Sequence, residues 1–359
     1  MSVRMLTLDA VSPRIWSAWR DLAANAAEPN PFHEPEAVLT AARHLDAPDT
    51  LRLAVVEADD QLLACLPVSS GRYWKRVPHR GVLAWRHQYC YLGTPLLRAD
   101  ALPEAAGGLL DVLTAHHRGR LLVLDRCHVE GPVFRALADA ADARGTRVNA
   151  DWCFERAIAT SDSAAPIALR GKHLKDLRRQ RRRMESALGA PLELIDREPD
   201  ADTVGAFLKL ESAGWKGAGG SALACADEGF FRTLCDSFSA DHRLRFASLE
   251  AAGRPVAMLC TIEAGGESHW FKITFDEDLG EYSPGRQLML DVTGRLGDSA
   301  PVRLLDSCAN PQNDTINRMW SGRRKLATLL IALPGLTRRP VDILAATSSR
   351  RHEGRGEST

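Results

Sequence analysis

Two carboxylates of this sequence are placed where they could remove a proton during a reaction. Asp306 follows a short apolar run, residues 302–305, that predicts a strand, and Glu211 lies on a predicted helix shortly before Trp215. A carboxylate acts as a general base when burial raises its pKa toward the working pH. We expect Asp306 or Glu211 to take this role. The alternatives are that Asp306 caps the turn after its strand and that Glu211 lies on a solvated helix face.

Two lysines are expected to contact a substrate. The Trp-Lys-Gly sequence at residues 215–217 ends a predicted helix, so Lys216 is placed to bind a carboxylate, a phosphate or an acyl carbonyl beside the apolar wall of Trp215. Lys272 lies in a predicted strand between an aromatic and an aliphatic residue, and its side chain therefore points away from theirs. The alternatives are that Lys216 offsets the negative end of its helix and that Lys272 lies in solvent.

A third feature is a predicted helix start that suits an anion. It follows a strand and consists of Ser283, Pro284, Gly285, Arg286, Gln287 and Leu288. The first N–H groups of a helix are free to bind a phosphate, serine and proline favour such a start, glycine allows a ligand to come close, and arginine adds a cation. We expect this turn to bind a pyrophosphate; the alternative is a capped helix start without a ligand.

These residues must be positioned by an α/β scaffold whose plan occurs twice. Each half predicts helices, then a β-hairpin, a helix, an apolar strand and a further helix. The hairpins fall at residues 51–68 and 244–262, and the apolar strands end in Leu-Asp-x-Cys at 124–127 and 305–308. Self-similarity over so long a period predicts that a whole α/β unit was duplicated, although short apolar strands can also look alike by chance.

Between the halves lies a strongly basic helix that we expect to meet phosphate groups. Its cations are Arg170, Lys172, Lys175, Arg178, Arg179, Arg181, Arg182 and Arg183, and they cover almost every side of a helix. The partner could be the phosphates of a donor, a tRNA acceptor stem, or an anionic polysaccharide or lipid surface. The alternative is a charged helix over the domain junction. No aromatic residue is interleaved, which argues against sequence-specific reading of nucleic acid.

The composition limits the remaining possibilities. The 359 residues predict two domains, and the 46 Lys and Arg balance the 46 Asp and Glu, so no net charge attracts nucleic acid or membrane. The cysteines are scattered singly, and we expect them to be reduced and to bind no metal. The apolar run at residues 326–333 is much shorter than a membrane span, and the first residues lack a signal-peptide pattern, so we expect a cytoplasmic protein.

Several segments, taken in their order along the chain, resemble one family. They are Asn30-Pro31-Phe32, the basic segment 171–183, residues 211–220 with Trp-Lys-Gly, residues 271–276, residues 282–286, and Asp306-Ser307-Cys308 with Trp320, Arg323 and Arg324. The chain resembles the GNAT superfamily of N-acyltransferases, specifically the CelD/BcsL type found in cellulose biosynthesis, which shares a tandem architecture with FemAB-like transferases. Many GNAT proteins carry two glycines in the pyrophosphate loop, whereas this turn has only Gly285.

The resemblance implies an α/β (α+β) protein with two tandem GNAT-like domains, each a mixed twisted sheet flanked by helices. We expect a degenerate N-terminal domain at residues 1–155, a linking segment with the basic helix at 156–190, a catalytic domain at 191–337 and a flexible tail at 338–359. The resemblance also implies that Trp215, Asp276 and Tyr282 bind substrate.

The implied activity is transfer of an acyl group, with acetyl expected, from acyl-CoA to an amine of a small molecule or saccharide precursor. Asp306, Glu211, Lys216 and Lys272 are then the expected catalytic residues, and the turn at 283–288 binds acetyl-CoA or another acyl-CoA. One alternative is a FemAB-like transferase that uses aminoacyl-tRNA through the basic helix. The other is a non-catalytic module of a polysaccharide-biosynthesis assembly.

Overall fold

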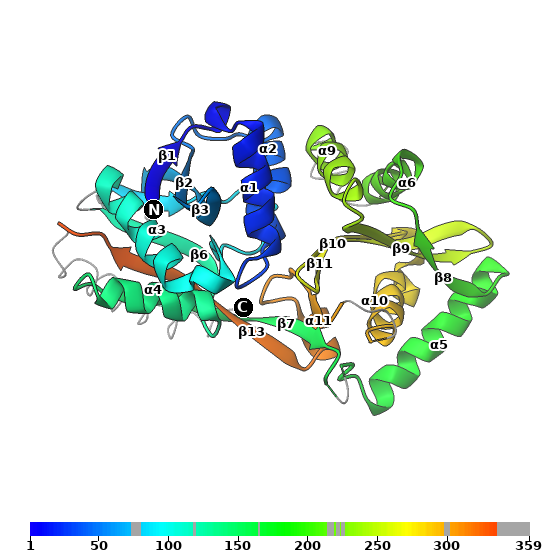
Figure 1. The fold of residues 1–359 in the computed structure, drawn as a ribbon. Coiled ribbons are helices and arrows are strands. Elements are labelled where there is room, and N and C mark those ends of the chain that lie inside the picture. Colours follow the sequence, from blue (N-terminus) through cyan, green and yellow to red (C-terminus); the bar gives the residue numbers. More distant parts are fainter. Residues whose placement is uncertain are drawn as a thin grey trace. The chain divides into compact units, whose positions relative to one another are not determined.

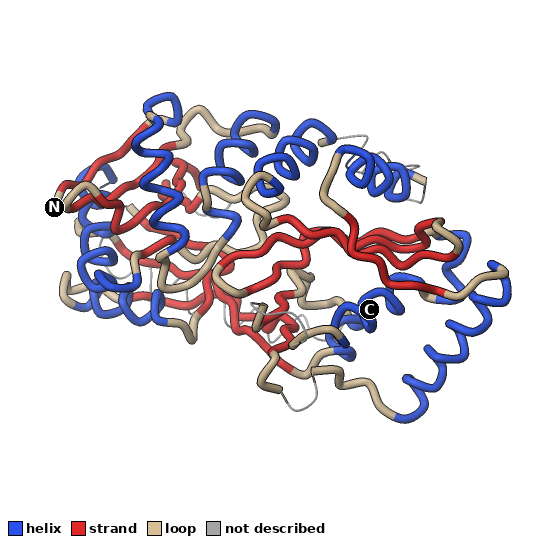
Figure 2. Tube along the Cα trace, turned by 45° about the vertical axis from the view of Figure 1, so that its right-hand side comes forward, coloured by secondary structure: helices blue, strands red, loops and turns tan. Residues whose placement is uncertain are grey.

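Two compact units are formed by this chain in a computed structural model, which describes residues 1–72, 80–117, 120–163, 166–213, 219, 223, 227–297 and 302–335. Unit 1 comprises Met1–Ala42, Asp46–Glu155 and the described residues from Lys325 onward. Unit 2 comprises Arg43–Leu45 and Arg156–Arg324. Figure 1 shows the elements of each unit, and Figure 2 distinguishes their helices from their strands.

Unit 1 contains a mixed sheet with the strand order β1-β2-β3-β4-β6-β13, and β5 pairs with β3. The strands are β1 (Ser2–Leu6), β2 (Arg52–Ala58), β3 (Gln61–Arg72), β4 (Arg80–Ala84), β5 (Leu96–Leu97), β6 (Leu121–His128) and β13 (Gly322–Ala332). Strand β4 runs parallel to β6, and the other pairs are antiparallel. The predicted hairpin at residues 51–68 is therefore the pair β2–β3.

The helices of unit 1 are α1 (Pro13–Ala24), α2 (Pro35–His44), α3 (Leu102–His117) and α4 (Pro132–Asp142). Helix α1 begins where the sequence favours it, because Pro13 fills the first position and the Ser12 hydroxyl accepts the N–H of Ile15 at 3.3 Å. Apolar residues of α3 and α4 pack on Val56, Leu66 and Leu122 of the sheet to form the main core of this unit.

Unit 2 contains a second series of strands with the order β7-β12-β11-β10-β9-β8. Its strands are β7 (Val148–Thr160), β8 (Leu192–Arg197), β9 (Leu244–Ala251), β10 (Arg254–Ala264), β11 (Glu267–Phe275) and β12 (Leu304–Asp306). Its helices are α5 (Gly171–Leu188), α6 (Ala201–Ser212), α9 (Glu228–Ser239), α10 (Pro284–Gly294) and α11 (Asp314–Met319), and the 3-10 helix η4 (Glu277–Tyr282) precedes α10.

The sheet of unit 2 lies between two layers of helices (Figure 1). Helices α6 and α9 cover one face through an aromatic cluster, in which the rings of Phe231 and Phe271 are stacked with their centroids 6.2 Å apart. Helix α10 covers the other face together with α5. There the rings of Trp270 and Trp320 meet edge to face at 4.6 Å, and Trp320 Nε1 donates to Thr293 Oγ1 at 2.9 Å.

The two units have the same strand plan, and each ends with a strand that the other half of the sequence supplies. In both, an antiparallel series leads to a parallel pair, β4–β6 in unit 1 and β11–β12 in unit 2. The next position is taken by β13 in unit 1 and by β7 in unit 2, so the closing strands are exchanged. The expected α/β fold with mixed parallel and antiparallel strands and flanking helices is thus confirmed, whereas the sequence did not predict the exchange.

Candidate functional site

The parallel strands β11 and β12 of unit 2 pair over three residues and then separate. We call the place where they separate, just after His269 and Asp306, the splay. Strand β11 pairs with β12 at Glu267–Leu304, Ser268–Leu305 and His269–Asp306, where β12 ends. Strand β11 continues to Phe275. In the described part of the chain no strand pairs with this second edge of β11 beyond His269. The edge therefore presents backbone groups to whatever occupies the splay.

A β-bulge lies at the same place. Lys272 of β11 is opposite Cys260 of β10, but Thr261 is opposite Trp270, so Phe271 is an extra residue in β11. A bulge bends its strand and redirects a backbone group, and bulges are frequent beside active sites. The unpaired edge of β11 begins after His269, and the bulge at Phe271 lies within this unpaired part. Lys272, which the sequence predicted to contact substrate, is half-buried here.

The predicted anion-binding turn forms the start of α10, but few of its N–H groups remain available. Ser283 is at the N-cap position with a left-handed φ of 56°, and its hydroxyl forms no capping hydrogen bond. The N–H groups of Arg286 and Gln287 both donate to Ser283 O, at 3.0 and 3.1 Å. Because Pro284 has no N–H, Gly285 carries the remaining amide of this turn, and the Arg286 guanidinium supplies the charge.

The later residues of the turn, which the sequence also predicted to bind the cofactor, are buried and make contacts within unit 2. Gln287 is buried, and its Nε2 donates to Leu177 O of α5 at 2.8 Å. Leu288 is buried in the core beneath the sheet. At Gly285 an added Cβ would lie 3.1 Å from the ring of Phe275, so this ring already uses the space that glycine leaves.

Asp276, the N-cap residue of η4, and Tyr282, its last residue, also have partners within unit 2. Asp276 pairs with Arg254 and accepts the N–H of Asp278 at 3.1 Å, so it caps η4. The guanidinium of Arg183 lies 5.4 Å from the centre of the Tyr282 ring. These contacts account for Asp276 without a substrate, whereas Tyr282 lies directly before the anion-binding turn.

Asp306 is part of a buried ionic network at the apex of the splay. Its Oδ2 accepts a hydrogen bond from Arg324 at 2.8 Å, and its Oδ1 lies 3.5 Å from the Arg156 guanidinium. Arg324 also donates to both carboxylate oxygens of Glu267 at 2.8 Å. The Oδ1 atom of Asp306 further accepts the N–H of Cys308 at 2.8 Å, which holds Cys308 at a left-handed φ of 50°.

This network makes Asp306 a poor general base. Burial by itself would raise the pKa of Asp306, but the charges of Arg156 and Arg324 outweigh burial and lower the pKa to about 2. Burial also lowers the pKa of the neighbouring His269 to about 4, so that histidine is neutral at pH 7. A carboxylate with so low a pKa is a weak proton acceptor at pH 7, and the contact of Asp306 with the N–H of Cys308 holds the turn after β12.

Arg156 and Arg324 are the site residues that sequence reasoning missed or left unassigned. Arg156 is an arginine within a strand, next to the small apolar Ala157, and its side chain is 1% exposed. Charged side chains are almost never fully buried unless they are paired. An arginine inside an apolar strand was therefore a usable signal for a buried carboxylate partner, although the sequence could not say which one.

Glu211 is buried near the end of α6 and does not lie on a solvated helix face. Its Oε2 accepts the N–H of Leu223 at 2.9 Å, so the carboxylate ties α6 to the chain at Leu223. Trp215 and Lys216 lie outside the described residues. Glu211 is thus a second buried carboxylate of unit 2, at the end of the helix that covers β11.

The corresponding splay of unit 1 is filled by its own chain. Gly93 N–H donates to Arg126 O at 3.1 Å, Cys127 Sγ donates to Gly93 O at 3.2 Å, and His128 N–H donates to Thr94 Oγ1 at 3.1 Å. The side chain of Asn30 holds the same loop, because its Nδ2 donates to Thr94 O at 2.7 Å. The first of the family-like segments, at Asn30, thus closes the opening that unit 2 keeps.

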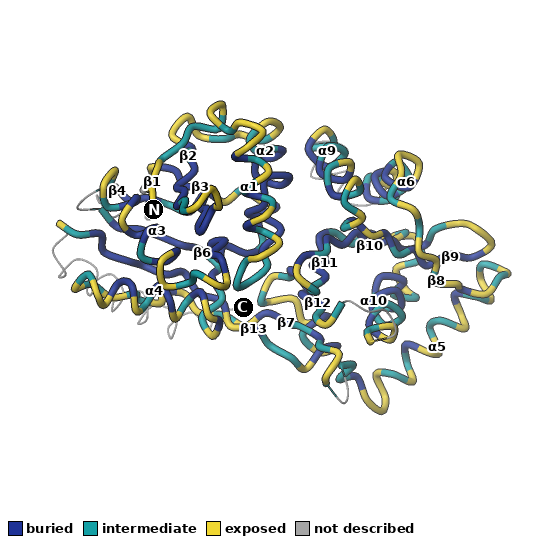
Figure 3. Tube along the Cα trace, viewed as in Figure 1, coloured by how far each residue is buried: buried dark blue, intermediate teal, exposed yellow. Residues whose placement is uncertain are grey.

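The cations of the basic helix α5 divide into a group that forms ion pairs and an exposed group that does not within the described ranges. Arg181 faces inward and donates to Asp291 at 2.7 Å and to Leu192 O at 2.9 Å, while Arg183 pairs with Glu281 at 2.9 Å. Exposed cations without an ion pair in the described ranges are Lys172, Lys175, Arg178 and Arg182. Exposed positions recur along α5 between buried and intermediate ones (Figure 3), and these four cations are among the exposed positions.

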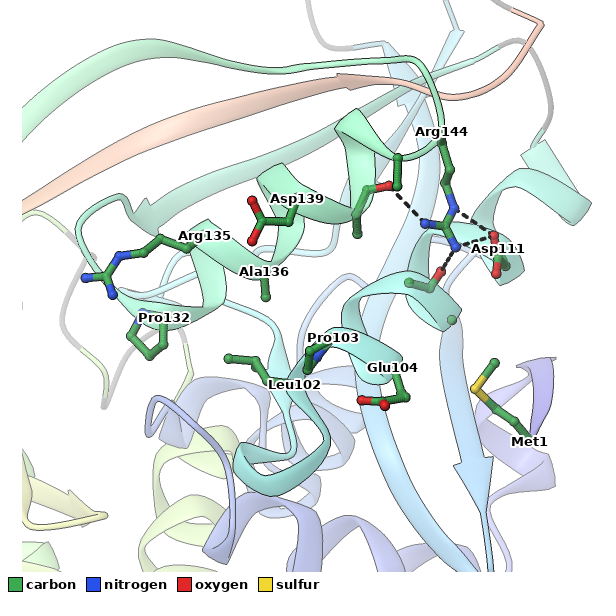
Figure 4. A pocket seen from close by; sticks show the side chains of 14 residues that line it. Met1, Leu102, Pro103, Glu104, Asp111, Pro132, Arg135, Ala136, Asp139 and Arg144 are labelled. Atoms are coloured by element: carbon green, nitrogen blue, oxygen red, sulfur yellow. Dashed lines mark hydrogen bonds and ion pairs between the residues drawn. The ribbon is translucent and has the colours of Figure 1, made fainter.

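Other features of the described residues offer less chemistry. No group of His, Cys, Asp and Glu side chains in these ranges is arranged to hold a metal ion. No helix among them is long and apolar enough to cross a membrane. A hollow between α3 and α4 of unit 1 is lined in part by glycine and alanine residues. Its Arg144 pairs with Asp111 and donates to Gly107 O (Figure 4).

Comparison with known proteins identifies the fold of unit 2. Residues 171–312, less than half of the chain, match the family model described as an acetyltransferase (GNAT) domain. These residues therefore form a domain with the GNAT acyltransferase fold. No curated protein matches the sequence significantly.

Solved structures with the same fold cover nearly all of the chain. FemX matches with a TM-score of 0.59 and 8% identity over 96% of this chain and 99% of its own. A conserved protein of unknown function from Bacteroides thetaiotaomicron matches with 0.54 and 11% over 89% and 97%. The C-terminal domain of a candidate lysylphosphatidylglycerol synthetase from Agrobacterium fabrum matches with 0.54 and 14% over 92% and 95%. At these identities the likeness concerns the fold.

Proposed function

We propose that unit 2 is an N-acyltransferase that binds an acyl thioester in the splay between β11 and β12. The observation that carries the proposal is the open edge of β11, which coincides with the bulge at Phe271. An extended amide-containing chain, such as the pantetheine arm of coenzyme A, pairs with such an edge as a strand would. Backbone N–H groups fixed along this edge would polarise the thioester carbonyl and stabilise the oxyanion of the transition state.

The acyl donor would be acetyl-CoA or another acyl-CoA, with its diphosphate at the start of α10. Gly285 offers a backbone N–H and Arg286 a guanidinium at this point, supported by the positive end of the helix dipole. Ser283 and Pro284 shape the turn, and Tyr282 borders it. This is a smaller anion site than a glycine-rich loop provides, so Arg286 contributes a large share of the binding.

The acceptor would be an amine of a small molecule or saccharide precursor. Its nitrogen attacks the thioester carbonyl carbon, the C–S bond breaks, and the thiolate leaves and is protonated as coenzyme A thiol. Glu211 is the proposed acceptor of the proton released from the amine, since the carboxylate of Asp306 is too weak a base. Trp215, Lys216 and Lys272 stay the proposed contacts of the acceptor and acyl group.

Unit 1 would be a degenerate copy without activity of its own. The loop with Gly93 and Thr94 hydrogen-bonds to β6 where its splay begins, so a thioester arm would compete with the protein's own chain for this place. One active site per chain follows from this assignment.

The experiment is calorimetric titration of acetyl-CoA into the wild-type protein and Arg286→Glu. We expect a weakening of at least about tenfold in Arg286→Glu, because a charge that attracted the diphosphate now repels it. Arg232→Glu, an exposed change on α9, is the matched control and should bind as wild type does. Absence of binding to the wild type, or an equal loss in both variants, would exclude coenzyme A from this turn.

A second candidate donor is an aminoacyl group carried by tRNA, and the exposed cations of α5 favour it. Binding of charged tRNA through phosphates would weaken steeply with salt. An unchanged tRNA affinity after replacing Arg178 and Arg182 by alanine would exclude this donor at α5, whatever the result with acetyl-CoA.

A further inference from the structure

A groove on unit 2 runs between α5, the C-terminal half of α10 and the start of β8, away from the predicted anion-binding turn. Its volume is about 620 Å³. One wall is apolar and contains Leu169, Leu174, Leu194 and Leu290. Two arginines of α5 and its N-cap, Arg170 and Arg178, stand at the edge of the same groove and are exposed.

The charges inside the groove are already matched, whereas those at its edge are not. Arg181 pairs with Asp291 at 2.7 Å, and Arg295 pairs with Asp196 at 3.0 Å. Within the part of the chain that the structure describes, Arg170 donates to the backbone carbonyls of residues 167 and 169 and to no carboxylate, so its positive charge is not neutralised by these residues. Arg178 has no ion pair within the described ranges. The edge therefore presents two uncompensated guanidinium groups beside an apolar wall.

The same charge continues along the outer side of α5. Lys172, Lys175 and Arg182 are exposed there, and with Arg178 they extend over about 15 Å of helix. The first turn of α5 contains no acidic residue, so the positive end of the helix dipole adds to this field. An opposing surface with many negative charges would meet all of these groups together.

We infer that this groove and the outer side of α5 dock the protein on an anionic phospholipid surface. The phosphate of one lipid would lie between Arg170 and Arg178, and the first methylene groups of its acyl chains would lie along Leu174 and Leu290. Guanidinium groups bind phosphate oxygens in pairs of parallel hydrogen bonds. The neighbouring cations would lie over further headgroups and add to the attraction.

The apolar wall distinguishes a lipid from the other polyanions. A nucleic acid or polysaccharide would satisfy the arginines but would leave Leu174 and Leu290 in water. The exposed side of α5 also has no Phe, Tyr or Trp on which a base could stack. Leu177 and Met184 of α5 are buried against unit 2, so α5 does not insert its own apolar face into the bilayer. The docking is therefore electrostatic and superficial, and it does not depend on the proposed transferase activity.

The test is co-flotation of the full chain with vesicles of phosphatidylglycerol and phosphatidylcholine. We expect binding that requires phosphatidylglycerol and decreases from 50 mM to 500 mM salt. Arg170→Glu with Arg178→Glu should reduce the vesicle affinity by at least about tenfold, as expected for two lost contacts. The matched control, Arg232→Glu with Arg245→Glu, lowers the net charge equally on two exposed arginines away from the groove and should retain binding.

Two further measurements distinguish binding to a lipid surface from binding to free phosphate. Leu174→Asn leaves every cation in place and should still weaken vesicle binding, while inorganic phosphate at the concentration of lipid phosphate should not compete. Circular dichroism verifies that each variant is folded, and Arg178→Gln replaces the double variant if the latter unfolds. Equal binding to pure phosphatidylcholine, an equal loss in the matched control, or binding of duplex RNA in place of vesicles would overturn the inference.

Discussion

Glu211 and Asp306 illustrate how surroundings decide the chemistry of a carboxylate. Both are buried, yet Asp306 contacts two arginines and Glu211 accepts a backbone N–H. The arginines stabilise the charged form of Asp306 and thereby remove its basicity. Asp306 instead fixes the turn at Cys308, which is where the second side of the splay leaves the sheet.

Replacing Glu211 by glutamine tests its role as proton acceptor. The amide oxygen of Glu211→Gln can still accept the N–H of Leu223, so the fold should be retained. We expect kcat to fall by about 10²–10⁴-fold, because general-base assistance contributes this much. Acetyl-CoA affinity should stay unchanged, as measured by calorimetry. Glu228→Gln, an exposed carboxylate on α9, should leave kcat unaltered, and full activity of Glu211→Gln would assign the proton to another group.

Buried histidines predict how stability depends on pH. Burial lowers the pKa of His33 to about 3 and of His87 and His269 to about 4, from 6.5 in an exposed histidine. Below pH 6.5 the unfolded chain therefore binds protons that the folded protein does not. The free energy of unfolding should be highest above pH 6.5 and should decrease as the pH falls toward 4.

Urea unfolding at several pH values measures this dependence. His269→Gln should reduce the slope between pH 6.5 and 4, even if it also lowers stability at pH 7. His173→Gln, an exposed change on α5, should leave the slope unchanged. A slope equal to wild type in His269→Gln would show that this histidine is not the neutral buried group described here.

At the scale of elements, the two parallel strand pairs differ in how the chain continues beyond them. The open edge of β11 continues past the pair, whereas in unit 1 the loop with Gly93 hydrogen-bonds to β6 beyond its pairing with β4. This loop comes so close to β6 that a Cβ on Gly93 would lie 1.9 Å from Asp125 O. Side chains are therefore excluded at residue 93, and the backbone itself closes the splay of unit 1.

Gly93→Ala is expected to destabilise unit 1 by about 2–4 kcal/mol, because either the loop or β6 must move away. Thermal and urea unfolding measure the loss, while acetyl-CoA affinity of unit 2 should be retained. Gly205→Ala is the matched control on α6, where an added Cβ meets nothing within 4 Å. That change should be neutral or stabilising by up to about 1 kcal/mol. Equal stability of both variants would contradict the close contact at Gly93.

At the scale of the whole molecule, the exchange of closing strands links the folding of both halves of the sequence. Strand β13 pairs with β6 through Leu326–His128 and Ala332–Leu121, although nearly 200 residues separate them. The main core of unit 1 includes Ala327, Leu329 and Ile331 of β13. Unit 1 is therefore completed only when the end of the sequence is present.

A fragment of residues 1–160 should consequently fail to form a stable monomer. It would leave the apolar edge of β6 exposed, and such edges pair between molecules and aggregate. Size-exclusion chromatography and near-UV circular dichroism measure this outcome. The same fragment with residues 322–335 joined by a flexible linker should regain solubility and a cooperative transition. A stable, monomeric 1–160 fragment would contradict the exchange.

The sequence determined much of the local structure, because turn chemistry and hydrophobic period act over a few residues. Pro35–His44 predicted a helix and is one, both hairpins lie where polar turns separate apolar runs, and Ser283-Pro284 starts a helix. The twofold plan was also readable, since both halves repeat the same order of elements.

Only the tertiary structure decided which groups meet. Arg156 and Arg324 meet Asp306 across strands far apart in sequence, and a pKa depends on such neighbours and on burial, neither of which a local pattern contains. The contact of Asn30 with the loop at Gly93 also joins residues far apart in sequence. The exchange of β7 and β13 likewise depends on pairing that no local pattern contains. The sequence determines the chemical type of each side chain. The electrostatic field and the free space around that side chain depend on residues that only folding brings together.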